Sequence, residues 1–429
     1  MLANHTDLHS IFRNHNQIST DSRQIIPGSI FFALKGDNFN GNKYANAAIE
    51  AGAACAVIDE PEYKNENTFL VEDVLESLQQ LARIHRGKFN IPVIAITGSN
   101  GKTTTKELTN AVLSQQFHVT ATKGNLNNHI GVPLTLLGIT NKTEIAIIEM
   151  GANHQGEIAA LCEIAKPTHG LITNIGKAHL GGFGGFEGVI KAKSELYNFL
   201  RNNNSTVYVN QDNPLLKGLS NGIAKVLYGT AENIFASGRI KVNTDHLELD
   251  WVSGTGVVGI KTNLVGDYNF ENVMAAICIG SDLGVASEKI KSAISTYIPS
   301  NSRSQSMKTA KNSIVLDAYN ANPTSMRVAV ENFSKLEAEH KMVILGDMLE
   351  LGDESLAEHS EIVSLIEDSG FEKAIFVGPH FSAAAGSKFP CFLTSDEANN
   401  WLPSQHIKDF LILVKGSRGI KMEKVLESL

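Results

Sequence analysis

Cysteine is scarce in this chain of 429 residues, which contains four, all far apart. Cys55, Cys162, Cys278 and Cys391 form no CxxC pair, so neither a disulfide framework nor a paired-cysteine zinc site is expected. Scattered single cysteines are typical of reduced thiols in a reducing compartment. The cysteine pattern therefore favours a cytoplasmic protein.

Long apolar runs and an excess of basic residues are also missing. No stretch approaches the roughly 20 apolar residues that a membrane-spanning helix needs, and the start, MLANHTDLHSIF, lacks the features of a signal peptide. Lys and Arg number 37 against 45 Asp and Glu, which gives a formal charge of −8. An acidic surface argues against a nucleic-acid partner, which would require a basic face. We expect no membrane span and no nucleic-acid partner.

Buried-strand patterns alternate with helical patterns along most of the chain, which is typical of α/β proteins. Near-continuous apolar runs at 91–97, 144–150 and 170–175 predict parallel strands covered on both faces. Residues 205–265 contain short alternating segments and predict a β-rich extension. After a Pro- and Ser-containing linker near residue 300, the strand–helix alternation starts again.

This organisation predicts an α/β protein of three domains, because 429 residues exceed one ordinary hydrophobic core. The expected domains are a small N-terminal α/β domain (1–88), a central P-loop ATPase-like doubly wound sheet with a β-rich extension (89–299), and a C-terminal Rossmann-like α/β domain (300–429).

The strongest local signal is TGSNGKTTTKE at residues 97–107, which follows an apolar strand and opens a helix. Gly98 and Gly101 allow the tight turn that points backbone N–H groups at a phosphate. Lys102 can reach the outer phosphates, and the Thr103 hydroxyl can hold Mg²⁺. The early glycine of the common phosphate loop is replaced by Ile96. The segment predicts an ATP-binding loop.

A phosphate loop does not name a reaction, so motor, GTPase, kinase and ligase functions remain open. A GTPase would carry an Asn-Lys-x-Asp base reader. The nearest match is NKTE at 141–144, which ends in Glu and disfavours that class.

Polar side chains also follow other predicted strands, where ligands of α/β sheets bind. Glu149 and His179 follow two strands of the central domain, and DAYNANP (317–323), GDMLELG (346–352) and KGSR (415–418) follow strands of the last domain. On its own, each of these turns is equally compatible with a solvated loop. Lys191 and Lys193 alone would indicate no more than a solvated helix face.

Together these motifs resemble the Mur ligase family over nearly the whole chain, including the missing early glycine at Ile96. Further motifs of the resemblance are TDSR (20–23), FALKGDNFNG (32–41), GNLNNHIGVPLTLL (124–137), EMGANH (149–154) and GDYNFENVMAA (266–276). The DAYNANP and GDMLELG turns are the most specific to one branch. That branch is an ADP-forming amide ligase that joins D-alanyl-D-alanine to the terminal carboxylate of a UDP-N-acetylmuramoyl tripeptide through an acyl phosphate, in cytoplasmic peptidoglycan precursor synthesis.

The resemblance also implies roles for individual residues. The catalytic set would be Lys102, Glu149, His179 and Lys193, with Lys193 carbamylated. Metal would be held by Thr103, Glu149, His179 and the Lys193 carbamate. ATP would be bound by Gly98, Ser99, Asn100, Gly101, Lys102, Thr103, Thr104, Asn272, Arg303 and Asp317. The two other substrates would be bound by Ser22, Arg23, Asn127, Asn128, Asn320, Asn322, Lys415 and Arg418, with the Asp347 turn near the dipeptide.

The implied cofactors are ATP and Mg²⁺, with two ions expected and Mn²⁺ a possible substitute, and a monomer is expected. Three alternatives stay open: another ligase of the same class that adds a single amino acid, a non-catalytic ATP-binding regulator, and a nucleotide switch. The sequence does not fix the third residue of the acceptor peptide.

Overall fold

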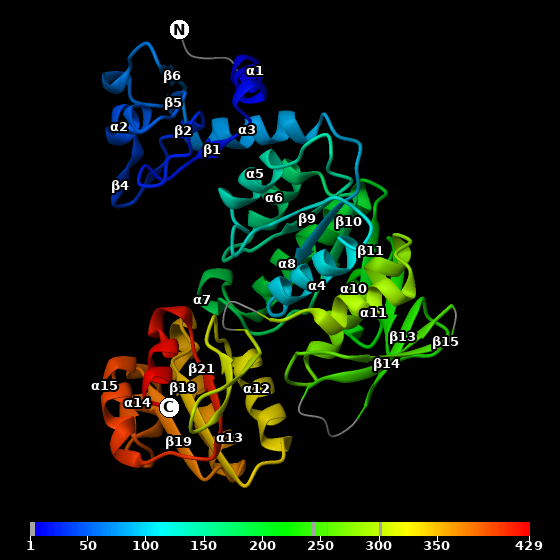
Figure 1. Ribbon diagram of the computed structural model, residues 1–429, viewed down its shortest axis with the longest axis vertical. Coiled ribbons are helices and arrows are strands. Elements are labelled where there is room, and N and C mark those ends of the chain that lie inside the picture. The colour runs from blue at the N-terminus through cyan, green and yellow to red at the C-terminus, as the bar shows by residue number, and fades with distance from the viewer. Residues whose placement is uncertain (1–4, 242–245, 255, 300–302) are drawn as a thin grey trace.

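The computed structural model describes residues 5–241, 246–254, 256–299 and 303–429. Figure 1 shows three bodies in chain order from top to bottom, each built on its own sheet. The sheets occupy residues 18–70, 93–261 and 305–415. The expected class, α/β with three domains, is confirmed.

The N-terminal body carries a four-stranded parallel sheet in the order β1–β2–β5–β6. Its strands are β1 (Ile18–Ser19), β2 (Ile30–Phe32), β5 (Cys55–Ile58) and β6 (Thr68–Leu70), with a hairpin of β3 (Lys35–Gly36) and β4 (Phe39–Asn40). Its helices are α1 (His5–His15), α2 (Ala45–Glu50) and α3 (Val74–Arg86).

Helix α3 connects this body to the centre of the molecule. The helix starts at Asp73, whose side chain accepts a hydrogen bond from the Glu76 N–H at 2.7 Å. Near its end, His85 Nε2 bonds the Ile139 carbonyl at 2.8 Å and Arg86 Nε donates to the Ala165 carbonyl at 3.0 Å. Because both partners belong to the central body, α3 fixes the N-terminal body onto it.

The central body is a nine-stranded sheet in the order β15–β14–β13–β12–β11–β10–β7–β9–β8, parallel from β8 to β13. Its strands are β7 (Val93–Thr97), β8 (Val119–Ala121), β9 (Ile145–Glu149), β10 (His169–Ile172), β11 (Thr206–Asn210), β12 (Ala224–Gly229), β13 (Ala236–Lys241), β14 (Glu248–Ser253) and β15 (Gly256–Lys261). Its helices are α4 (Lys102–Leu113), α5 (Gly131–Leu137), α6 (Glu157–Ala165), α7 (Leu180–Phe183), α8 (Phe186–Asn202), α9 (Pro214–Leu219), α10 (Asn269–Asp282) and α11 (Ser287–Thr296).

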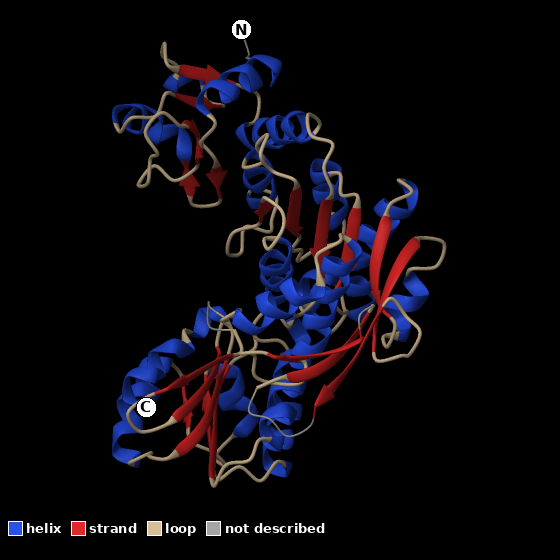
Figure 2. Ribbon diagram, turned by 45° about the vertical axis from the view of Figure 1, so that its right-hand side comes forward, coloured by secondary structure: helices blue, strands red, loops and turns tan. Residues whose placement is uncertain are grey.

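The predicted β-rich extension is smaller than expected. β11 and β12 are parallel strands of the main sheet, and only β13–β15 form the antiparallel edge that Figure 2 shows at one side of the molecule. β11 is short and has polar residues at both ends, yet four of its five residues are buried. The spacing of apolar residues in the sequence therefore did not reveal that the parallel sheet continues through β11 and β12.

The C-terminal body has a six-stranded sheet in the order β16–β17–β21–β18–β19–β20, parallel except at β16. Its strands are β16 (Gln305–Lys308), β17 (Ser313–Asp317), β18 (His340–Gly346), β19 (Lys373–Val377), β20 (Cys391–Phe392) and β21 (Phe410–Lys415). Its helices are α12 (Pro323–Lys335), α13 (Ser355–Asp368), α14 (Pro379–Ala385) and α15 (Ser395–Trp401). Apolar side chains of the central strands form its core, because these strands are covered on both faces.

Candidate active site

The loop between β7 and α4 has the backbone that a phosphate cradle needs. Gly98 and Gly101 have φ angles of 144° and 77°, which L-residues with side chains rarely adopt. A Cβ at Gly98 would lie 2.0 Å from Thr173 Oγ1, and one at Gly101 would lie 2.4 Å from Asn272 Oδ1. Both glycines are therefore required by conformation and by space, and the loop opens directly into the N-terminus of α4.

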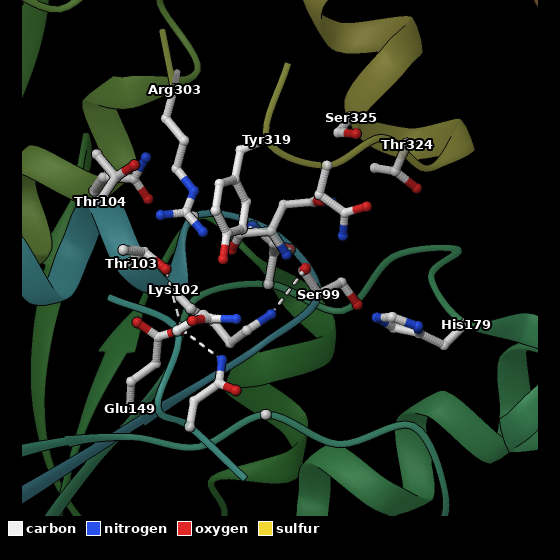
Figure 3. A pocket seen from close by; sticks show the side chains of 18 of the residues that line it. Ser99, Lys102, Thr103, Thr104, Glu149, His179, Arg303, Tyr319, Thr324 and Ser325 are labelled. Carbon is white, nitrogen blue, oxygen red and sulfur yellow. Dashed lines mark hydrogen bonds between the residues drawn. The ribbon is translucent and has the colours of Figure 1, made fainter. Parts of the chain in front are cut away.

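Lys102 lies across this loop at the bottom of the pocket that Figure 3 shows. Its Nζ donates to the carbonyls of Gly98 at 2.7 Å and Ser99 at 3.1 Å. Desolvation lowers the pKa of Lys102, and the carboxylate of Glu149 partly opposes that shift. The amine is therefore held where a phosphate of a bound nucleotide would gain most from it.

Glu149 ends β9 next to this loop and is buried. Its Oε1 accepts hydrogen bonds from Thr103 Oγ1 at 3.0 Å and Asn127 Nδ2 at 2.8 Å. Among the residues that the structure describes, its buried Oε2 has no hydrogen-bond partner, and Lys106 Nζ lies 3.9 Å away. A buried carboxylate oxygen beside a threonine hydroxyl is a donor set that fits a hard cation such as Mg²⁺.

His179 lines the same cleft as Glu149, and its ring also contacts the C-terminal body. It precedes α7 in the left-handed conformation, with φ 51°, and its Nδ1 lies against the Glu350 carboxylate of the C-terminal body. The imidazole lowers the pKa of Glu350 by hydrogen bonding. Within the part of the chain that the structure describes, no three His, Cys, Asp or Glu side chains form a metal-binding group.

Lys193 is buried on α8, behind the pocket wall rather than in it. Its Nζ lies 3.5 Å from the carbonyl of Ala152, which lines the pocket, and 5.2 Å from the centre of the Phe183 ring. Desolvation first, and the charge of Lys102 second, lower the pKa of Lys193 to about 7. A substantial part of this amine is therefore neutral near pH 7.

The C-terminal body contributes the opposite wall. Asp317 and Lys415 are register partners at the ends of β17 and β21, and Lys415 Nζ donates to Asp317 Oδ2 at 2.5 Å. Two guanidinium groups lie near the ring of Tyr319, that of Arg303 at 3.5 Å and that of Arg418 at 5.7 Å from its centre. Figure 3 shows Arg303 and Tyr319 side by side above the phosphate loop.

The two walls enclose a cleft of about 980 Å³ that brings most of the predicted residues together. Of these, the cleft is lined by Ser99, Asn100, Gly101, Lys102, Thr103, Thr104, Asn127, Asn128, Glu149, His179, Asn272, Arg303, Asp317, Asn320 and Lys415. The predicted residues outside the lining are Gly98, Lys193, Asn322, Arg418, Ser22 and Arg23. Ser22 and Arg23 belong to the N-terminal body, where Arg23 pairs with Asp21 at 2.7 Å.

Several predicted amides are engaged in local structure. Asn272 accepts from Thr105 Oγ1 at 3.0 Å and so supports the phosphate loop from α10. Asn128 accepts from the N–H groups of Ile130 and Gly131 and caps α5. Asn320 accepts from the N–H of the residue that follows it. Their side chains shape the cleft as well as line it.

The Asp347 turn does not present its carboxylate to the cleft. The side chain is buried and accepts from the N–H groups of His380 at 2.9 Å and Phe381 at 2.8 Å, at the start of α14. An acidic residue after a strand predicts a ligand site, but here the same residue satisfies a helix N-terminus.

Two residues of the site were missed by sequence reasoning. Lys106 is fully buried beneath the phosphate loop and donates to the Thr122 carbonyl at 2.7 Å. Its place in the loop motif was a weak signal, since a helix lysine is ordinarily solvated. Tyr319 gave no signal except its position between Asp317 and Asn320 in the DAYNANP turn.

A glycine-bounded phosphate loop at the carboxyl end of a parallel sheet, facing a second α/β domain across a cleft, defines an enzyme that uses a nucleoside triphosphate. Residues 15–86 match the Mur ligase family catalytic domain, residues 96–280 the Mur ligase middle domain, and residues 302–418 the Mur ligase glutamate ligase domain. The chain belongs to the Mur ligase family, and the predicted family and enzyme class are confirmed.

Relatives and solved structures agree over almost the full length. The UDP-N-acetylmuramoyl-tripeptide--D-alanyl-D-alanine ligase of Bacillus subtilis (strain 168) is 36% identical, with 96% of this chain and 92% of the relative covered. A crystal structure of MurF from Acinetobacter baumannii matches with a TM-score of 0.87 at 31% identity, covering 96% of this chain and 93% of that one. MurF of Thermotoga maritima, solved in complex with ADP, matches with a TM-score of 0.85 at 26% identity, covering 96% and 97%. None of the helices among the described residues has the length and apolar character to span a membrane.

Proposed function

We propose that this enzyme joins D-alanyl-D-alanine to the terminal carboxylate of a UDP-N-acetylmuramoyl tripeptide and converts ATP to ADP and phosphate. The observation that carries the proposal is the phosphate loop with Lys102 across it and buried Glu149 beside it, whose Oε2 has no hydrogen-bond partner in the described part of the chain. The full-length relatives named for this reaction support the choice of substrates.

The reaction needs an activated carboxylate, because a carboxylate oxygen is a poor leaving group. The γ-phosphoryl group of ATP passes to the tripeptide carboxylate and gives an acyl phosphate, and the dipeptide amine then displaces phosphate. Lys102 and the N–H groups of the loop stabilise the negative charge that spreads over the transferring group. Closure of the two walls excludes water, which would hydrolyse the acyl phosphate.

Magnesium would be held by Thr103 and Glu149, whose oxygens adjoin in the cleft wall. When bound, Mg²⁺ neutralises phosphate charge and orients the phosphates for in-line transfer. We propose a second ion near His179 and a carbamylated Lys193, and Mn²⁺ as a possible substitute. The lowered pKa of the buried Lys193 amine supports carbamylation, because only the neutral amine reacts with CO₂ and a substantial part of this amine is neutral near pH 7.

The remaining assignments follow the family. Ser22 and Arg23 would hold the uridine nucleotide, while Asn127, Asn128, Asn320, Asn322, Lys415 and Arg418 would contact the peptide substrates. Asn272, Arg303 and Asp317 would bind ATP with the loop residues. We propose domains 1–88, 89–299 and 300–429, a monomeric enzyme in the cytoplasm, and a role in peptidoglycan synthesis and hence in cell shape and division.

The test is phosphate release by the purified protein with ATP and Mg²⁺, adding the UDP-N-acetylmuramoyl tripeptide and D-alanyl-D-alanine singly and together. Release only with both substrates, with the amide product identified by mass, is the expected result. Release that is independent of the dipeptide would refute the proposed acceptor. Release with a single amino acid in its place would identify another ligase of the same class.

Replacing Lys193 by Met should stabilise the protein while removing its activity. The pKa of Lys193 is lowered in the folded state, so the folded state binds fewer protons than the unfolded state between about pH 7 and the ordinary lysine range. Stability therefore falls as pH drops through this window, and the penalty is full below pH 7. We expect Lys193→Met to raise the free energy of unfolding by roughly 1–3 kcal/mol at pH 6.5 and by less at pH 9.

Denaturant unfolding at both pH values in CO₂-free buffer measures this difference. Lys191→Met, an exposed lysine on the same helix, is the control and should show little change at either pH. An equal effect of Lys193→Met at pH 6.5 and pH 9 would contradict the buried neutral amine.

A further inference from the structure

The segment after β10, residues 174–177, lies between the phosphate loop and the C-terminal body. Ser99 of the loop holds this segment twice, because its Oγ donates to the Gly176 carbonyl at 3.0 Å and accepts from the Gly176 N–H at 2.9 Å. A Cβ at Gly176 would lie 2.8 Å from Thr324 Oγ1 on α12. Because residue 176 is a glycine, the segment that Ser99 holds can lie directly against α12 of the C-terminal body.

Lys177 then bonds that domain through both its backbone and its side chain. Its N–H donates to Thr324 Oγ1 at 3.0 Å, and its Nζ donates to Glu358 Oε1 on α13 at 2.5 Å. The side chain of Lys177 is 45% exposed, whereas that of Glu358 is 6% exposed. The pair is thus unlike an ordinary surface ion pair, because a separated Glu358 would leave a charge in a mostly buried place.

A second contact runs parallel to the first. Asn322 caps α12 with its Oδ1, which accepts from the Ser325 N–H, and its Nδ2 donates to Asn100 Oδ1 of the phosphate loop at 2.7 Å. The Asn100 N–H in turn donates to Asn174 Oδ1 at 2.9 Å. Two neighbouring residues of the phosphate loop, Ser99 and Asn100, are thereby tied to α12, the first through Gly176 and Lys177 and the second directly.

We infer that Lys177 is a positioning residue, which seats the C-terminal domain on the phosphate loop by anchoring residues 174–177 to Glu358 and Thr324. The anchor sets the separation between the loop and the wall that carries Arg303, Asp317 and Lys415. Lys177 is not among the residues that line the large cleft; it acts through Gly176 and Ser99. The kinetic consequence rests on the proposed ligase function, whereas the anchor itself does not.

A charge exchange tests the anchor. We expect Lys177→Glu to lower kcat about thirtyfold, because it places two carboxylates opposite each other, and Glu358→Lys to have a similar effect. The double variant Lys177→Glu/Glu358→Lys should regain activity to within about threefold of the wild type, since the pair is restored with reversed sign. Lys142→Glu is the matched control: it makes the same charge change in the exposed turn before β9 and should leave kcat unchanged.

If Glu358→Lys does not fold, the conservative variant Lys177→Arg still tests the anchor. Arginine keeps the positive charge and has a side chain long enough to reach Glu358. Lys177→Arg should retain kcat within about threefold while Lys177→Ala loses about fivefold. The unfolding midpoint of Lys177→Arg should match the wild type, whereas Lys177→Ala and Lys177→Glu should lower it, because both leave the mostly buried Glu358 without its partner. kcat is therefore measured at a temperature at which every variant is fully folded. Loss of kcat there without recovery in either the exchange or Lys177→Arg overturns the inference.

Hydrogen exchange of peptides that span residues 174–182 gives a readout that needs no acceptor substrate. With ATP and Mg²⁺ present, the Lys177 amide should be protected in the wild type and in the Lys142→Glu control, and should exchange at least about tenfold faster in Lys177→Glu. Equal exchange in all three overturns the anchor. If the exchange result holds but the wild type forms no amide product, the proposed function fails and the anchor stands.

Discussion

Lys102→Ala is expected to lower substrate-dependent phosphate release by about 10³-fold. The amine lies over the loop that would hold the β- and γ-phosphates, and it donates hydrogen bonds to the carbonyls of Gly98 and Ser99. Charge develops on the γ-phosphoryl group during transfer, and a fixed cation in a partly desolvated site stabilises it more than water does. The loss should therefore appear in kcat rather than in the KM for the peptide substrates.

The fold should survive this change, because desolvation already disfavours the charged form of Lys102. We expect the unfolding midpoint to stay the same or rise. Lys142→Ala, an exposed lysine of the same domain, controls for the loss of one positive charge and should keep full activity. Retention of more than about a tenth of the activity by Lys102→Ala would mean that the loop does not bind the transferred phosphate.

The fold was largely predictable because strands of parallel sheets are apolar along their whole length. The runs that became β7, β9, β17, β18 and β21 stand out in the sequence, and each ends at a polar residue or a glycine. β11 was harder to place, since its apolar centre is only three residues long and is also compatible with an antiparallel strand. The packing of α3 against the central body could not be derived, because it depends on distant carbonyls at Ile139 and Ala165.

Residues of the site could be predicted where their function depends on a short local motif. They could not be predicted where the contacts of a side chain lie in another domain. The phosphate loop is a local structure, so Gly98, Gly101 and Lys102 could be assigned from spacing. That Asn322 contacts the dipeptide stays a prediction, and nothing in the sequence indicated the helix cap and the bond to Asn100, 222 positions away, that its side chain makes in the structure. Asp347 likewise caps α14. Such partners are fixed only when the sheets are assembled.

Glu149→Gln is expected to lower kcat by about 10²-fold and to raise the Mg²⁺ concentration at half-maximal rate by about tenfold. Glutamine preserves the shape of the side chain and one oxygen, which can still accept from Thr103 and Asn127. The change removes the negative charge from the buried Oε2, for which the described residues offer no hydrogen-bond partner. A hard cation binds a neutral amide oxygen less tightly than a carboxylate, so the deficit should be partly recovered at high Mg²⁺.

The cost in stability should be small, within about 2 kcal/mol, because Lys106 keeps other partners when the charge of Glu149 is removed. Its Nζ still donates to the Thr122 carbonyl at 2.7 Å and lies 2.8 Å from a carboxylate oxygen of Glu107. Glu163→Gln, an exposed change of the same kind on α6, should alter neither the rate nor the metal requirement. A Mg²⁺ titration of phosphate release separates the possibilities: if the half-maximal concentration is unchanged in Glu149→Gln, the carboxylate does not hold the metal, and its buried charge serves only to balance Lys102 and Lys106.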